Sequence, residues 1–332
     1  MSKTYDVCAI GNALIDYEIE VNDDFFSTNG VEKGVMTLVD ESKQNELVDL
    51  VQGNIKKKQG GGSAANTVFG MSQLGGKGFY TCKVAGDDDG ELFMSDLRKN
   101  GIATNLNGDQ LPVGITGKCL VMVSPDAERT MNTFLGITSD LSVNEIDKGA
   151  IKESEYLFME GFLVSSETGL VAMKEAKKIA ETNNVKVSLT FSDPSMVKYF
   201  RDQMIDVVGD GVDLLFCNVE EAQLFTGLED LEEVKAALEK IARQFVITFS
   251  EKGSLAFDGT GYSMIEPFPV DAVDSTGAGD MFAGAFLYGI NKGHSFAEAG
   301  RLASLASSIV VGKYGPRLNE EQISKIKERL SM

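Results

Sequence analysis

Short apolar runs alternate with segments of helical periodicity along most of the 332 residues, and this alternation constrains the fold more than any other feature. Runs that are typical of buried strands occupy residues 5–10, 78–84, 155–160, 185–189, 213–216 and 244–248. Segments with the period of an amphipathic helix include residues 41–51, 63–74, 91–99, 167–181 and 231–241. Repeated strand–helix–strand units predict an α/β fold with a mostly parallel sheet that helices cover on both faces.

Two regions interrupt this alternation. Strand-like runs follow one another without an intervening helix at residues 17–21 with 35–39, and at 114–123 with 130–135. They predict a small antiparallel sheet, inserted at about 17–39 and 114–135, that forms a lid over a crevice at the carboxyl ends of the parallel strands. Because only six prolines occur and no low-complexity linker separates the segments, we expect a single domain over residues 1–332.

The charge balance and hydropathy exclude several classes of partner. The formal net charge is −19, which argues against nucleic acid, whose binding depends on Lys and Arg neutralising phosphates. No run approaches the ~20 apolar residues that a membrane-spanning helix needs. The first residues, MSKTYDVCAIGNALID, are typical of a first strand and its loop rather than a signal peptide. We therefore expect a cytoplasmic protein that binds small molecules.

The chain offers few side chains for catalysis. Its one histidine, His294, lies in a polar turn, which nearly excludes Ser-His-Asp or Cys-His catalysis and histidine metal sites. The four cysteines form no CxxC pair and lie in apolar runs, which indicates buried, reduced thiols. The chemistry must therefore depend on carboxylates, amides, backbone groups and a bound ion.

The segment DSTGAGD, residues 274–280, combines an anion site with a carboxylate. Glycines at 277 and 279 permit a tight turn into an apolar helical run, so the amides of Gly277, Ala278 and Gly279 can converge on a phosphate. Asp280, in the first turn, can take a proton from a hydroxyl that attacks that phosphate. Taken alone, the segment could also be an ordinary glycine-permitted helix start.

Two other kinds of nucleotide site, the P-loop and the dinucleotide-binding loop, are not supported by the sequence. The chain contains no GxxxxGK[ST] sequence, so it is not a P-loop protein. Residues 60–65 fit GxGxxA, but they follow the polar stretch NIKKKQ rather than a buried strand, which argues against a dinucleotide site.

Several motifs together resemble the PfkB family, also called the ribokinase family, and within it adenosine kinases in particular. Residues 61–66 (GGSAAN), with 85–90 (AGDDDG) after a helical segment, resemble its N-terminal signature. Residues 274–280 resemble its C-terminal signature, and 218–221 (NVEE) its NxxE motif. The resemblance implies a ribokinase-like three-layer sandwich with a small β lid, and ATP-dependent phosphorylation of a nucleoside or sugar hydroxyl.

The resemblance also assigns roles to individual residues. It implies that Asp16, supported by Asn12, holds two sugar hydroxyls, and that Gly61, Gly62 and Asn66 bind the same sugar. Each has an ordinary alternative when taken alone: Asp16 as a turn residue, for instance, and Asn66 as an exposed helix position.

For the nucleotide, the resemblance implies that Asn218 and Glu221 position Mg²⁺ through water. The loop TFSEKG, residues 248–253, resembles a nucleotide-binding TxGxxG loop in which Ser250 replaces the first glycine. Asp274, with carbonyls of residues 312–315, is the place where relatives hold a monovalent cation such as K⁺. The residues expected to contact ATP are Asn218, Thr248, Ser250, Gly253 and Ser307.

The acceptor remains open at this level. Phe162, with Met36 and Phe134, could form an apolar slot for a nucleoside base, which favours adenosine and its conversion to AMP. Glu160 at a strand end and Arg129 in the lid instead suit a free sugar such as ribose, fructose or 2-keto-3-deoxygluconate, or a phosphate. A non-catalytic binding relative is a third alternative, against which the presence of Asp280 argues. Both a monomer and a homodimer are compatible with the sequence.

Overall fold

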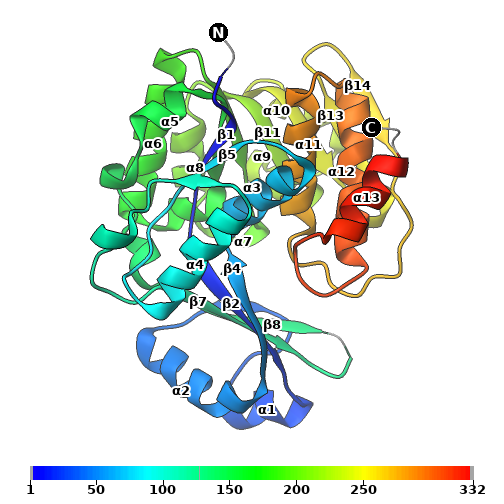
Figure 1. Cartoon of the computed structure of the whole chain (residues 1–332). Coiled ribbons are helices and arrows are strands. Elements are labelled where there is room, and N and C mark those ends of the chain that lie inside the picture. The colour runs from blue at the N-terminus through cyan, green and yellow to red at the C-terminus, as the bar shows by residue number, and fades with distance from the viewer. Residues whose placement is uncertain (1–2, 127, 330–332) are drawn as a thin grey trace.

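A computed structural model describes residues 3–126 and 128–329 and shows a large layered body with a smaller sheet beneath it (Figure 1). The body is built on a nine-stranded sheet in the order β14-β13-β12-β11-β10-β9-β1-β5-β6. Its strands are β1 (Tyr5–Ile10), β5 (Gly78–Thr81), β6 (Ala103–Thr104), β9 (Ser154–Glu160), β10 (Lys186–Thr190), β11 (Val212–Asn218), β12 (Ala242–Thr248), β13 (Ser254–Phe257) and β14 (Tyr262–Ile265).

Neighbouring strands from β6 through β12 are parallel, and only β13 and β14 are antiparallel. Each of the six body strands that the apolar runs predict is present, which confirms the mostly parallel sheet. The parallel order brings the carboxyl ends of β1, β9, β10, β11 and β12 to one edge of the sheet, where ligands of open α/β sheets bind.

Alternating side chains of the central strands enter two separate apolar cores. Val7 and Ala9 of β1 belong to one core, whereas Cys8 and Ile10 belong to the other. The helices that pack in the first core are α3 (Ser63–Leu74), α4 (Asp88–Lys99), α11 (Ala278–Asn291), α12 (Phe296–Val311) and α13 (Glu320–Arg329). Those around the second are α5 (Lys148–Lys152), α6 (Glu167–Thr182), α7 (Pro194–Tyr199), α8 (Arg201–Val208), α9 (Val219–Thr226) and α10 (Leu231–Leu238). The result is the expected three-layer sandwich.

The smaller sheet is the predicted lid. Its order is β3-β8-β7-β2-β4, from β2 (Leu14–Glu20), β3 (Met36–Leu38), β4 (Ile55–Gly61), β7 (Gly117–Val123) and β8 (Arg129–Phe134). The pair β7–β8 is antiparallel, as expected, and so is β2–β4, but β2–β7 and β3–β8 are parallel, so the lid sheet is mixed rather than antiparallel throughout. The runs 17–21 and 35–39, expected without an intervening helix, are separated by a short helix at Asp23–Asn29. The sequence did not predict β4. It is an edge strand that carries exposed lysines, which protect an edge from pairing with another chain but remove the apolar alternation.

The two faces of the lid differ. On β2, Ile15, Tyr17 and Ile19 point into the first core, together with apolar residues of α1 (Asp23–Asn29) and α2 (Glu41–Val51). These two helices lie on the side of the lid away from the body (Figure 1). The opposite face carries Asp16 and Glu18 and is turned toward the body. The apolar lid face is therefore covered by the chain's own helices.

Among the helices of the described residues, none combines the length and apolar character that crossing a bilayer requires.

Candidate active site

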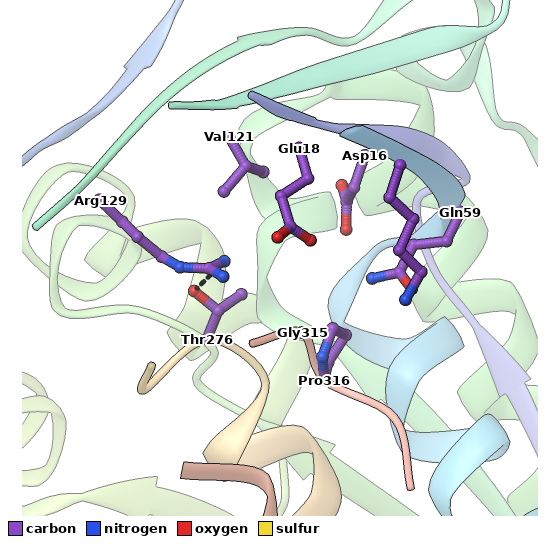
Figure 2. A pocket seen from close by; sticks show the side chains of 9 residues that line it. Asp16, Glu18, Gln59, Val121, Arg129, Thr276, Gly315 and Pro316 are labelled. Carbon is purple, nitrogen blue, oxygen red and sulfur yellow. Dashed lines mark hydrogen bonds between the residues drawn. The ribbon is translucent and has the colours of Figure 1, made fainter. Parts of the chain in front are cut away.

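A crevice lies between the lid and the body. Figure 2 shows Asp16, Glu18 and Arg129 reaching from lid strands toward the body loops at Thr276, Gly315 and Pro316. The residues that line the pocket are Asp16, Glu18, Lys57, Gln59, Val121, Arg129, Thr276, Gly315 and Pro316. Charged and amide side chains thus dominate its lid side.

The body side of the crevice is formed by the start of α11. Gly277 caps this helix with φ 73°, the left-handed region, and a β-carbon on it would lie 2.3 Å from Cβ of Pro316. Only glycine fits this position. The amide of Ala278 donates to the carbonyl of Ser275 at 3.1 Å, which closes the turn before the helix. The segment is therefore a helix N-terminus that opens toward the crevice, as the motif predicts.

Asp280 is held by the start of a second helix, α3. Its Oδ1 accepts a hydrogen bond from Ser63 Oγ at 2.6 Å, and its Oδ2 accepts one from Asn66 Nδ2 at 3.1 Å. Burial raises the pKa of Asp280 to about 6, although the hydrogen bonds from Ser63 and Asn66 oppose this shift. A carboxylate whose pKa lies just below neutrality is suited to act as a general base.

Asp16 lies against the glycine loop, as the resemblance implies. A β-carbon on Gly61 would fall 2.3 Å from Asp16 Oδ2. Burial raises the pKa of Asp16 to about 7, while Arg317 and Arg129 favour the ionised form and Asp280 opposes it. Asp16 and Asp280 therefore share one site, which brings together residues that lie far apart in the sequence.

Glu160 lies behind the site rather than in its lining. Its carboxylate has no exposed surface, and it accepts hydrogen bonds from Asn12 N (2.7 Å), Asn12 Nδ2 (2.8 Å) and Ala64 N (2.8 Å). Burial raises its pKa to about 7. Its contacts hold the loop after β1 against the start of α3, so Glu160 and Asn12 support the site from behind. Glu160 was expected to contact a sugar hydroxyl, but its buried carboxylate instead binds Asn12 and Ala64.

The NxxE segment forms a capping box at the start of α9. Asn218 Oδ1 accepts from Glu221 N at 2.8 Å, and Glu221 Oε2 accepts from Asn218 N at 2.9 Å. Burial raises the pKa of Glu221 to about 7, and the like charge of Asp193 adds to the shift. Glu221 Oε1 also accepts from Asn218 Nδ2 at 2.9 Å, so a hard divalent cation here would be held through water rather than by direct ligation. No group of three or more ligating His, Cys, Asp or Glu occurs in the described residues, so such a cation would keep most of its water.

The loop after β12 keeps a glycine-like backbone path despite its serine. Ser250, the first residue of a short 3₁₀ turn, has φ 52°, and Gly253 at its end has φ 88°. A β-carbon on Gly253 would lie 2.1 Å from the carbonyl oxygen of Ile265. Thr248 ends β12 at the same edge of the sheet, and Ser307 donates to the carbonyl of Ala278 at 2.9 Å.

Asp274 does not fit the expected cation site. Its carboxylate lies 2.6 Å from Nη2 of Arg129 and has no exposed surface. It also accepts hydrogen bonds from the amides of Thr276 (2.9 Å) and Gly315 (2.8 Å). A cation needs oxygen ligands around it, and here positive and N–H groups occupy those positions.

Phe162 lies in the 3₁₀ turn Gly161–Ser165 after β9 and packs, half-buried, against the second core. It does not line the pocket described above. Direct contact between Phe162 and a substrate base therefore finds no support in its position.

Sequence reasoning missed several lining residues. Glu18 shares a strand face with Asp16, and Lys57 and Gln59 lie opposite them on β4, so a correct β4 prediction would have indicated all three. Arg317, which lies next to the pocket rather than in its lining, had no local signal: it pairs with Asp96, donates to the carbonyl of Gly60, and stacks with its Cζ 3.4 Å from the Phe69 ring centroid.

Comparison with known proteins identifies a family. Residues 34–323 match the family model of the pfkB family of carbohydrate kinases. The chain is 25% identical to adenosine kinase of Saccharomyces cerevisiae (97% of this chain, 99% of the relative) and 30% identical to ribokinase of Haemophilus influenzae (77% and 82%).

Two solved structures have the same fold with a TM-score of 0.90. One is a probable sugar kinase from Rhizobium etli, 30% identical and covering 99% of each chain. The other is adenosine kinase from Sinorhizobium meliloti, 31% identical over 98% of this chain and 99% of that one. Relatives at this similarity include both nucleoside and sugar kinases.

Proposed function

The chain belongs to the pfkB family of carbohydrate kinases, and from this premise we propose that it transfers the γ-phosphoryl group of ATP to a primary hydroxyl of adenosine, giving AMP. The observation that carries the proposal is the convergence of Asp16, Asn66 and Asp280 under one lid. This arrangement places an acceptor-binding carboxylate beside a base whose pKa is close to neutral.

Acceptor binding depends on Asp16 and Asn66. Two neighbouring hydroxyls of a ribose can donate to the two oxygens of Asp16, which lie over Gly61. Asn66 Oδ1 is buried and finds no hydrogen-bond partner within the described residues, so it is available to accept from a third hydroxyl. These contacts leave the primary hydroxyl directed toward Asp280.

Phosphoryl transfer then proceeds in line. The acceptor hydroxyl gives its proton to the Asp280 carboxylate while its oxygen bonds to the γ-phosphorus, and the bond to the β–γ bridging oxygen breaks to release ADP. The amides of Gly277, Ala278 and Gly279 stabilise the charge on the equatorial oxygens. Mg²⁺, positioned by Asn218 and Glu221 through water, would neutralise part of the ATP charge. The residues Thr248, Ser250, Gly253 and Ser307 surround the ATP side of the site.

Water must be kept from the reaction, because it would otherwise accept the phosphoryl group. The lid strands place Asp16, Glu18 and Arg129 over the start of α11, so a bound acceptor would be covered on that side. Covering the site in this way favours transfer to the acceptor over hydrolysis of ATP.

A free sugar is the second candidate acceptor. The lid side of the crevice carries Asp16, Glu18, Lys57 and Gln59, and such a polar surface suits a molecule rich in hydroxyls or a sugar acid. Phe162, which with Met36 and Phe134 was expected to form an apolar slot for a base, is half-buried against the second core. Ribose, fructose and 2-keto-3-deoxygluconate are therefore included among the acceptors to be assayed.

The test measures ADP formation with Mg·ATP and, in turn, adenosine, other nucleosides, ribose, fructose and 2-keto-3-deoxygluconate. We expect the highest kcat/KM with adenosine and no response from Asp280→Asn. A kcat/KM that is highest for a free sugar would assign the chain to that sugar and retain the same base. If no acceptor of the panel raised ADP formation above the ATPase background, the proposed acceptor class would be refuted.

A further inference from the structure

Two basic side chains occupy the place where the sequence resemblance implies a monovalent cation. We infer that Arg129, paired with Asp274, and Lys313, bonded to the carbonyl of Gly315, take the place of the ion, so that this kinase neither binds nor requires K⁺ beside the phosphate loop. The inference rests on the proposed function only in taking residues 274–280 as that loop; the arrangement of charges does not depend on the acceptor.

The carboxylate half of the expected site is already satisfied. Asp274 Oδ2 lies 2.6 Å from Arg129 Nη2 and accepts from Gly315 N at 2.8 Å, while Oδ1 accepts from Thr276 N at 2.9 Å. Thr276 Oγ1, the neighbouring side-chain oxygen, lies 3.3 Å from Arg129 Nη1 (Figure 2). The guanidinium therefore forms an ion pair with the Asp274 carboxylate and a hydrogen bond with the hydroxyl beside it.

The carbonyl half is satisfied by a second cation. Lys313 Nζ donates to the carbonyl of Gly315 at 3.0 Å and lies 3.4 Å from that of Tyr314. These carbonyls belong to the segment 312–315 that was expected to complete the cation's ligands. An ammonium and a K⁺ ion carry the same charge and compete for the same carbonyl oxygens, so the bound lysine replaces the ion.

Burial makes this compensation necessary. Asp274 has no exposed side-chain surface, and Arg129 exposes 11% of its side chain. An isolated carboxylate in such a position would be strongly destabilising, whereas a paired one is tolerated. The ring of Tyr314, whose centroid is 5.9 Å from Arg129 Cζ, covers the pair further.

The replacement also connects the lid to the phosphate loop. Arg129 begins β8 of the lid, whereas Asp274 and Thr276 belong to the loop that leads into α11. A free ion could satisfy Asp274 with the lid in any position, but Arg129 can do so only when the lid lies over the body. Arg129 is therefore a positioning residue that aligns the loop when the crevice is covered.

The experiment measures thermal unfolding of the whole chain, without substrates, in KCl and in choline chloride at the same ionic strength. The wild-type Tm should be the same in both salts. Arg129→Met removes the cation paired with Asp274, so KCl should raise its Tm by about 3 °C or more relative to choline chloride, because an ion that binds only the folded state stabilises it. Arg129→Lys keeps the charge and should remain insensitive to the salt.

The double variant Arg129→Met with Asp274→Asn is the control, and its response to K⁺ should disappear. A wild-type Tm or ADP-forming rate that rises specifically with K⁺ would overturn the inference, as would an Arg129→Met protein whose Tm is the same in both salts. If Arg129→Met does not fold, the wild-type comparison decides alone. Because unfolding is measured without an acceptor, failure of the proposed substrate would not affect this result.

Discussion

Asp280 and Ser63, 217 residues apart in the sequence, are joined by a hydrogen bond of 2.6 Å between Oδ1 and Oγ. Ser63 begins α3 and Asp280 lies in the first turn of α11. The two helices pack closely: a β-carbon on Gly284 of α11 would lie 2.3 Å from the carbonyl oxygen of Thr67 in α3. The proposed acceptor loop and the proposed base are therefore fixed on one helix pair, which sets their separation before any ligand binds.

Replacing the base should abolish turnover without abolishing nucleotide binding. We expect Asp280→Asn to lower kcat by about 10³-fold, since a positioned general base contributes roughly 10²–10⁴. The KM for ATP should stay near the wild-type value. Asp271→Asn, an exposed carboxylate before the same loop, is the matched control and should retain full activity. Near-wild-type turnover in Asp280→Asn would remove Asp280 from the mechanism.

The raised pKa of Asp280 should appear in the pH profile. A base must be ionised, so kcat/KM for the acceptor should rise about tenfold per pH unit below 6 and level off above it. The hydrogen bond from Ser63 lowers this pKa, so Ser63→Ala should move the rising limb to higher pH. The profile of each variant can be measured by ADP formation. A limb that stays in place, or moves to lower pH, would contradict the assignment.

The contact between Asp16 and Gly61 should control acceptor affinity. Gly61→Ala would place a methyl group within 2.3 Å of Asp16 Oδ2, so the carboxylate must move and the acceptor KM should rise about tenfold or more. The KM for ATP should change little. Gly53→Ala is the matched control because its β-carbon would meet no atom within 4 Å. Equal acceptor KM values for the two variants would exclude this role of Gly61.

The acidic run AGDDDG, residues 85–90, has a structural role where the start of α4 contacts the lid strands β2 and β7. Asp89 is buried at the start of α4, accepts from Tyr17 Oη with both oxygens at 2.8 Å, and lies 3.3 Å from Lys118 Nζ. Asp89→Asn should lower the free energy of unfolding by about 2 kcal/mol, because it unbalances a buried polar cluster. The neighbouring Asp88→Asn, at an exposed position, should have no effect in the same urea titration.

The regular elements were largely predictable from the sequence. The predicted segments 5–10, 41–51 and 63–74 coincide with β1, α2 and α3. The strand β1 is a short apolar run buried on both faces, and α2 buries one face at helical spacing. The strand β4 was not predictable in this way. It is an edge strand with three consecutive lysines, all exposed, so its pairing with β2 depends on hydrogen bonds of the backbone rather than on an apolar pattern.

The site was predictable where it consists of local motifs and not where it consists of pairs. The glycine turn before α11 and the NxxE segment at the start of α9 are short motifs that the sequence shows directly. The pairing of Arg129 with Asp274 and the enclosure of Glu160 depend on how distant segments pack. No local pattern specifies which partner such a charged residue meets.

Ser250 provides a test of backbone strain in the proposed ATP loop, residues 248–253. Its φ of 52° lies in the left-handed region, which costs a residue with a β-carbon about 1–2 kcal/mol. Ser250→Gly removes this strain but increases the entropy of the unfolded chain, so we expect a net gain of about 0.5–1 kcal/mol in the free energy of unfolding. Ser250→Ala, which keeps the β-carbon, should show no such gain in the same urea titration.

The KM for ATP separates this backbone strain from a direct contact between the Ser250 hydroxyl and the nucleotide. If the serine only follows the path of the loop, both variants should keep the wild-type KM, whereas a hydroxyl that binds the nucleotide would raise the KM equally in both. A loss of stability in Ser250→Gly would show that the side chain, rather than the backbone, determines the conformation of this loop.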